Sequence, residues 1–147
     1  MKLGFLILAH DNPANVARLV TLLLESGSAV CLHYDLKGGD APLQEISERL
    51  GELADRLILA ERVRVSWGEW SIVEATLNGL AALLGSGAEL DYIHLMSGAD
   101  YPIRPVSEFR GFLERQNGLD FIESHAVARR QWVKGGLSRE RYQYRHL

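Results

Sequence analysis

The amino-acid sequence predicts an α/β domain with a mostly parallel sheet and helices on both faces. Short, almost continuously apolar runs alternate along the chain with longer segments in which apolar residues recur at helical spacing. The first run, residues 3–9, contains no charged side chain and is typical of a strand covered on both faces. Ligands of such folds bind beyond the carboxyl ends of the strands, so the residues that follow each strand matter most for function.

The first half of the chain has the order and length of a strand–helix–strand unit. After the first strand, Asn12 suits the N-cap and Pro13 the first position of a helix that ends before Gly27. A second buried strand follows at 29–34 and closes with Asp35. Apolar spacing then indicates a second helix and two short strands, at 43–53, 57–59 and 63–65.

The second half adds further helices and strands in the same alternation. Ser71 and Glu74 stand at the spacing of a capping box, which predicts a helix that starts at Ser71 and stops at Gly85. An apolar strand is expected at 92–96, and Ser107 suits the N-cap of a helix through Leu113. A last short strand is expected at 121–122.

The composition indicates one globular domain and argues against several functions. The chain has 147 residues, of which 47% are hydrophobic and 24% charged. Its formal net charge of -3 argues against a dedicated nucleic-acid binder. From Ser124 onward six Arg and Lys residues stand against one acid, a pattern that fits a solvated end, a partner contact or an anion site. The single cysteine, Cys31, excludes an intramolecular disulfide and is expected to be a small buried residue.

The N-terminal apolar run does not indicate a membrane segment. It is shorter than the roughly 18 residues that a membrane-spanning helix needs, and no small-residue cleavage site follows it. We therefore expect no membrane span and a cytoplasmic protein, with membrane association left as an alternative.

Polar residues follow three of the predicted strands. His10 follows Ala9, Asp35 ends the second strand, and Asp100 follows the strand at 92–96. In a parallel sheet all three ends lie on one edge, where Asp35 could accept hydrogen bonds from a uracil N–H or a ribose hydroxyl. Asp35 could equally cap the loop that follows it.

Two tryptophans precede the helix predicted at Ser71. Trp67 suits a loop position, where its indole could stack on a base or a sugar ring. Trp70 fits a hydrophobic staple at the start of the helix, and the helix N-terminus could help to hold an anion.

Several common sites have no counterpart in the sequence. It contains neither the Gly-x-Gly-x-x-Gly nor the P-loop pattern, no Gly-x-Ser-x-Gly elbow and no Cys/His cluster with zinc spacing. A close Asp-x-Asp pair, the common metal–diphosphate device of sugar transferases, is also absent. These absences give no support to a dinucleotide, P-loop, hydrolase-triad or zinc site.

Four stretches together resemble the core-2/I-branching β-1,6-N-acetylglucosaminyltransferase and peptide xylosyltransferase family. They are Ile7 to His10, Cys31 to Asp35, Val65 to Leu77 and Leu95 to Ile103, in the family's order and at about its spacing. The resemblance implies a Rossmann-like GT-A domain that binds a UDP-sugar. It also implies inverting, metal-independent transfer of N-acetylglucosamine or xylose to a hydroxyl of a glycan or protein, so we expect neither a metal nor another cofactor.

The resemblance also implies roles for particular residues. The donor would be held at Ala9, His10, Asp35, Trp67 and Asp100, and the acceptor would contact Glu123, Arg139 and Arg141. The catalytic Glu base and the basic residues that neutralise the departing diphosphate are expected beyond Leu147, in a C-terminal half of the catalytic domain. Residues 1–125 would then form the UDP-sugar-binding part and 126–147 the start of an acceptor-side segment, with poor order there as an open alternative.

Two other hypotheses stay open at this point. One is a non-catalytic interaction module on the same fold, with an apolar face that would drive self-association. The other is an unrelated α/β nucleotide-binding enzyme, which rests on fold-level analogy alone.

Overall fold

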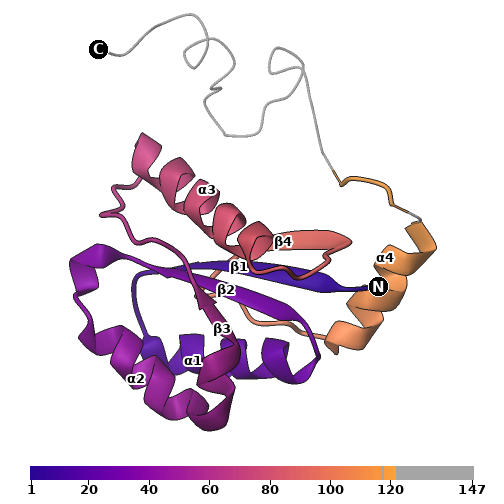
Figure 1. Ribbon diagram of the computed structural model, residues 1–147, viewed down its shortest axis with the longest axis horizontal. Helices are drawn as coiled ribbons and strands as arrows, with labels where there is room; N and C mark the ends of the chain where they lie inside the picture. The colour runs from indigo at the N-terminus through magenta and orange to yellow at the C-terminus, as the bar shows by residue number, and fades with distance from the viewer. Residues whose placement is uncertain (117, 122–147) are drawn as a thin grey trace, which may run out of the picture.

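The computed structural model describes residues 1–116 and 118–121, which form one sheet with helices on both faces (Figure 1). The sheet has four strands in the order β3-β2-β1-β4, and every neighbouring pair is parallel. The strands are β1 (Leu3–Ala9), β2 (Ala29–Tyr34), β3 (Leu57–Leu59) and β4 (Tyr92–Ser97). The predicted α/β class with its parallel sheet, as in a Rossmann-like GT-A domain, is confirmed.

Three α-helices and two short 3-10 helices connect the strands of the described part of the chain, and a fourth α-helix follows the last strand. The α-helices are α1 (Pro13–Glu25), α2 (Ala41–Leu50), α3 (Trp70–Gly85) and α4 (Val106–Gln116). The 3-10 helices are η1 (Leu36–Gly38) and η2 (Gly51–Arg56). Figure 1 shows α1 and α2 on one face of the sheet and α3 on the other. The helix α4 packs at the end of the α1 layer, where the Arg110 guanidinium donates to the Ser26 carbonyl at 2.8 Å.

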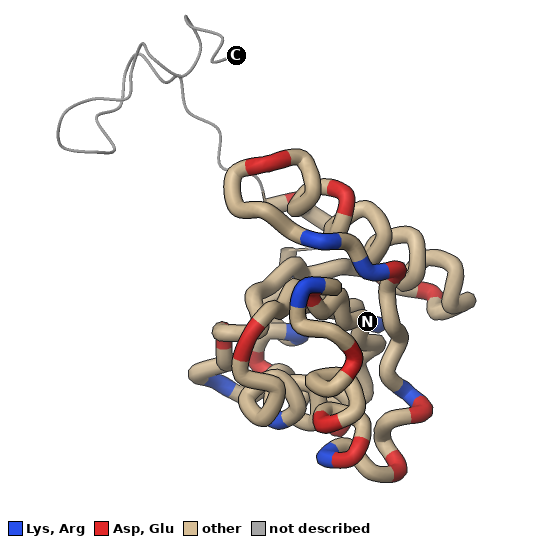
Figure 2. Tube along the Cα trace, turned by 90° about the vertical axis from the view of Figure 1, so that its left-hand side faces the viewer, with Lys and Arg blue, Asp and Glu red and all other residues tan. Residues whose placement is uncertain are grey.

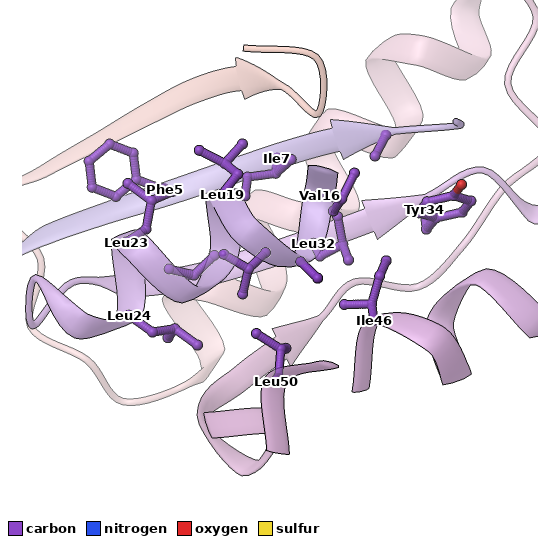
Figure 3. Packing of buried hydrophobic residues seen from close by; sticks show 14 of the residues in the cluster. Phe5, Ile7, Val16, Leu19, Leu23, Leu24, Leu32, Tyr34, Ile46 and Leu50 are labelled. Atoms are coloured by element: carbon purple, nitrogen blue, oxygen red, sulfur yellow. The ribbon is translucent and has the colours of Figure 1, made fainter. Parts of the chain in front are cut away.

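The core has two layers because successive side chains of β1 point to opposite faces of the sheet. Phe5 and Ile7 face α1 and α2 and join the larger hydrophobic cluster, part of which Figure 3 shows. Leu6 faces α3 and joins a second cluster with Cys31 and Leu83. β1 lies between β2 and β4, and helices cover both faces of the sheet at this strand. Its side chains are therefore buried on both faces, which explains why its sequence is a continuous apolar run. Burial raises the pKa of the Cys31 thiol to about 11, as expected for a small buried residue.

The predicted ends of α1 are confirmed. The Asn12 side chain accepts a hydrogen bond from the Asn15 amide at 3.1 Å, and Pro13 is the first helical residue. After Glu25 and the C-cap Ser26, Gly27 has a φ of 78°, a backbone conformation that glycine adopts without steric cost. The helix thus leads directly from the end of β1 and returns the chain to the start of β2.

Three predictions near α3 are wrong. Residues 63–65 form no strand, because the backbone groups of Val63 and Val65 bond instead to the segment 33–37, through three of its side chains and one backbone amide. The helix begins at Trp70 without a side-chain cap, since the Ser71 hydroxyl is bonded to the backbone of Ser66. Trp70 is the first helical residue and is 68% exposed, so it is not a staple.

Smaller differences occur in three other segments. The helix predicted at 43–53 ends at Leu50 and continues as η2. Ser107 lies inside α4, which begins at Val106. Phe121 is not in a strand, and Ile122 lies outside the described residues, as does the expected domain boundary after residue 125.

The helix α3 is apolar on its outer side as well as on the side that packs on the sheet. Its exposed residues include four large hydrophobic ones at helical spacing, Trp70, Val73, Leu77 and Leu84. Within residues 1–116 and 118–121, no helix combines the length and apolar character needed to cross a bilayer.

The close approach of α3 to β1 depends on Gly79. A Cβ at this position would lie within 2.9 Å of both methyl carbons of the fully buried Leu6. We expect Gly79→Ala to lower the free energy of unfolding by on the order of 1 kcal/mol, because overpacking costs about 1–3 kcal/mol and the better helix propensity returns about 1 kcal/mol. Urea unfolding followed by circular dichroism measures the change.

Gly111 in α4 provides the matched control. A Cβ there would meet only Arg115 Nη1, at an ordinary 3.5 Å. Gly111→Ala should therefore raise the free energy of unfolding by up to about 1 kcal/mol. Equal stabilisation by both substitutions would contradict the tight packing at Gly79.

Candidate functional site

The carboxyl ends of β2 and β4 are hydrogen-bonded directly to the end of β1. The Asp35 amide donates to the Ala9 carbonyl at 2.8 Å, and the Gly98 amide donates to the Leu8 carbonyl at 2.8 Å. Gly98 allows the close approach, because a Cβ there would lie 2.6 Å from the Ala9 Cβ. These bonds hold the ends of three strands side by side at one edge of the sheet.

A cleft of about 690 Å³ opens at this edge, between the strand ends and the first turns of α3. All five residues that the sequence predicts for the donor line this cleft: Ala9, His10, Asp35, Trp67 and Asp100. The remaining lining residues are mostly apolar and are Leu8, His33, Lys37, Val65, Ile72, Ala75, Leu95, Met96 and Ser97. The predicted proximity of His10, Asp35 and Asp100 is therefore present, whereas their roles stay predictions.

A second hollow of about 340 Å³ adjoins the cleft. The two share Leu8, Ala9, His10 and Ser97 in their walls. The smaller one extends to Asn12 and Asn15 at the start of α1. The side chain of His10 is exposed at the boundary between them.

The Asp35 carboxylate caps the loop that follows it, which is one of the two alternatives that the sequence left open; the contact with a nucleotide stays a prediction. Asp35 is only 7% exposed, and its Oδ1 accepts hydrogen bonds from the Lys37 amide at 2.9 Å and the Val65 amide at 3.3 Å. The first bond caps η1. Among the described residues no donor reaches Oδ2, so this oxygen is free to accept from a ligand in the cleft.

Asp100 closes the turn that follows β4. Its Oδ2 accepts from the Ser97 amide at 2.8 Å, and its own amide donates to the Ser97 carbonyl at 3.0 Å. The Ser97 hydroxyl accepts from the Ala99 amide at 3.1 Å within the same turn. The carboxylate is exposed on one wall of the cleft, where it can accept from a hydroxyl group while it holds the turn.

Trp67 lies at the rim of the cleft and is 95% exposed. It precedes Gly68, whose φ of 79° turns the chain into α3. The wall beside Trp67 is apolar, with Ile72 and Ala75 from α3. An exposed indole next to an apolar wall is suited to stack on a planar ring.

His33 is a buried residue of the site that the sequence placed only at the end of a strand. It is 1% exposed, and its Nε2 accepts a hydrogen bond from the Val63 amide at 3.0 Å. Burial lowers the pKa of His33. The imidazole is therefore neutral at physiological pH, as a ring nitrogen that accepts from an amide must be.

Positive charge in the cleft is scarce. Among the described lining residues, Lys37 is the only Lys or Arg, and its ammonium donates to the Val65 carbonyl at 2.6 Å. Arg62 lies nearby, but its guanidinium is bonded to the carbonyls of Tyr34, Asp35 and Gly39 and to the Asp40 carboxylate. Figure 2 views the molecule from the side where the strands end and shows basic and acidic residues interspersed there.

The acceptor side of the predicted site lies elsewhere in the chain. Glu123, Arg139 and Arg141 fall outside the described residues. In the part of the chain that the structure describes, no three His, Cys, Asp or Glu side chains are grouped so that they could hold a metal ion.

Comparisons with known proteins agree on one family. The model of the Core-2/I-branching enzyme family matches residues 3–145. A human beta-1,3-galactosyl-O-glycosyl-glycoprotein beta-1,6-N-acetylglucosaminyltransferase 3 is 26% identical over 122 residues, and the Bos taurus protein of the same name is 23% identical over 144. A bovine herpesvirus 4 beta-1,3-galactosyl-O-glycosyl-glycoprotein beta-1,6-N-acetylglucosaminyltransferase is also 23% identical over 144 residues.

The matched regions cover most of this chain but a minor part of each relative. They include 83% of the chain for the human protein and 98% for the bovine and viral ones. They include 28% of the human relative and 31% of the other two. The chain thus spans less than a third of the length of these relatives.

The lowered pKa of His33 predicts a pH dependence of stability. Because the unfolded chain takes up a proton near pH 6.5 and the folded chain only at lower pH, stability is constant above this range and is lost as the pH falls below about 6.5. His33→Gln keeps an acceptor for the Val63 amide but does not titrate. Urea unfolding between pH 7.5 and 5 should therefore show a smaller loss for His33→Gln than for the wild type.

The exposed His10 serves as the control for this experiment. His10→Gln should retain the full acid-induced loss of the wild type, because its side chain lies in solvent in both states. The same pH slope in His33→Gln and the wild type would contradict the assignment of the loss to His33.

Proposed function

The chain belongs to the Core-2/I-branching enzyme family, and we propose that it forms the donor-binding part of a glycosyltransferase that uses a UDP-sugar. The observation that carries this proposal is the single cleft that joins Ala9, His10, Asp35, Trp67 and Asp100. The cleft lies at the carboxyl edge of a parallel sheet, the position at which α/β folds bind nucleotides. It is mostly apolar with a few convergent polar groups, as small-molecule sites are.

The chemistry of the cleft suits a uridine nucleotide. The free Oδ2 of Asp35 can accept a hydrogen bond from the uracil N–H or a ribose hydroxyl. The indole of Trp67 can stack on the base, an interaction that contributes about 1–3 kcal/mol. Ala9 and His10 form the wall between these two groups and the second hollow, where backbone and ring atoms can contact the nucleotide.

We further propose inverting transfer without a metal ion, to a hydroxyl of a glycan or a protein. In this reaction the acceptor oxygen bonds to the anomeric carbon as the bond to the UDP oxygen breaks, and a carboxylate takes the acceptor proton. Cations must stabilise the charge on the departing UDP. Neither the Glu base nor these cations is assigned to a described residue, and both stay predictions.

N-acetylglucosamine is the first candidate for the transferred sugar, because the similar proteins are named as N-acetylglucosaminyltransferases. Xylose is the alternative that the sequence resemblance left open. The donor sugar, the acceptor and the participation of a C-terminal half of the domain are proposals for the whole protein.

Calorimetric titration with UDP tests the proposal. We expect the chain to bind UDP and Asp35→Asn to lower the affinity by about tenfold or more, since a hydrogen bond to a charged group contributes about 1.5–3 kcal/mol. Asparagine retains an oxygen for the Lys37 and Val65 amides, and its NH2 group replaces the Oδ2 acceptor by a donor, so the substitution removes the bond to the ligand while it keeps the backbone contacts. UDP-N-acetylglucosamine and UDP-xylose, titrated in parallel, report the sugar preference.

Glu52→Gln is the matched control, because Glu52 is an exposed acid of η2 that does not line the cleft. It should bind UDP as the wild type does. A folded wild type that fails to bind UDP would refute the donor-binding function and favour the interaction module. Thermal stabilisation by ATP or NAD but not by UDP would favour the unrelated nucleotide enzyme.

A further inference from the structure

The stretch from Val63 to Val65 crosses the carboxyl end of β2 and is held there mainly by side chains. The Val63 amide donates to His33 Nε2 at 3.0 Å, and its carbonyl accepts from the Leu36 amide at 3.2 Å. The Val65 amide donates to Asp35 Oδ1 at 3.3 Å, and its carbonyl accepts from the Lys37 ammonium at 2.6 Å. Every backbone polar group of these two residues is thus bonded to the segment 33–37.

In this arrangement side chains of the segment 33–37 bond to the backbone of Val63 and Val65, where a neighbouring strand would use its own backbone groups. His33 and Asp35 stand two residues apart at the end of β2, as do the two valines that they bind. Side chains at this spacing point to the same face of an extended chain. We call the side chains of His33, Asp35 and Lys37 the β2 clamp.

The β2 clamp acts two residues before Trp67. The Trp67 side chain is 95% exposed, so packing against its own indole contributes little to its position. The next residue after Val65 is also fixed, because the Ser66 amide donates to the Ser71 hydroxyl at 2.8 Å. The position of the indole at the cleft therefore depends on the backbone before it, which the clamp holds at Val65 and which the bonds of Ser66 to Ser71 and Glu69 hold on the side of α3.

We infer that Lys37 is a positioning residue, which holds the Val65 carbonyl so that Trp67 is in place at the rim of the cleft before a ligand binds. A group that is fixed in its bound position loses less entropy when the ligand arrives, and this raises affinity. The inference rests on the proposed function for the identity of the ligand, a uridine nucleotide. The positioning of Trp67 itself does not depend on it.

Asp35 connects the clamped backbone before Trp67 with the cleft. Asp35 binds the clamped backbone with Oδ1 and has Oδ2 available to the cleft. A ligand that bonds to Asp35 and stacks on Trp67 thus contacts both ends of the same hydrogen-bonded unit. Loss of the Lys37 bond should weaken ligand binding through Trp67, and not through a lost contact with the ligand.

The first experiment needs no ligand. In a variant that keeps Trp67 as its only tryptophan, with Trp70→Phe and Trp132→Phe, time-resolved fluorescence anisotropy reports the motion of the indole. Adding Lys37→Met should increase the amplitude of the fast motion, whereas Lys37→Arg, which keeps a donor, should largely restore it. Lys2→Met, at an exposed lysine that pairs with Glu89, should leave it unchanged.

The second experiment separates positioning from direct contact by a double-mutant cycle on UDP affinity. Lys37→Met alone should weaken UDP binding several-fold and by no more than about tenfold, because the stack on Trp67 must then order the indole when the ligand binds. In the Trp67→Ala background the same substitution should change the affinity less than twofold. Additive losses would show that Lys37 contacts the nucleotide directly and would overturn the positioning role.

The outcomes distinguish this inference from the proposed function. Unchanged anisotropy in Lys37→Met would overturn the clamp even if UDP binds normally. Absence of UDP binding by the wild type would refute the proposed function, while a change in anisotropy would still support the positioning of Trp67. Circular dichroism and the urea midpoint of each variant confirm that the fold is retained.

Discussion

The candidate site depends on the parallel pairing of β1 with a strand on each side. This register brings the carboxyl ends of β2 and β4 to the end of β1, where the bonds from Asp35 to Ala9 and from Gly98 to Leu8 extend the pairing beyond the strands. A shift of one residue in either pairing would turn every side chain of the shifted strand to the other face. Such a shift is costly because β1 is buried on both faces, so the core fixes the geometry of the site.

The same constraint explains what could be predicted from the sequence. The strands β1 and β2 are buried on both faces and have continuous apolar runs. The polar residues that follow β1, β2 and β4, which are His10, Asp35 and Asp100, line one cleft as the sequence predicted. The N-cap at Asn12 was predictable because the side chain bonds within its own helix. Local patterns of this kind depend only on residues close in the chain.

The errors arose where a local pattern competes with a contact from elsewhere. Val63 and Val65 look like a strand, but their partners are side chains of β2 and η1, which no local periodicity reveals. Ser71 has capping-box spacing to Glu74, yet its hydroxyl bonds to Ser66. The role of His33 was missed for the same reason, since a histidine at the end of an apolar strand gives no sign of the amide that it accepts from.

The charged groups that line the cleft suit one part of the proposed reaction better than another. The described cleft contains the carboxylates of Asp35 and Asp100 but only one Lys, whose ammonium is bonded to Val65. Arg62 cannot replace it, because its guanidinium already binds three carbonyls and Asp40. The lining of this cleft therefore suits the neutral parts of a nucleotide, the base and ribose, whereas a diphosphate would need cations from outside the residues that line it.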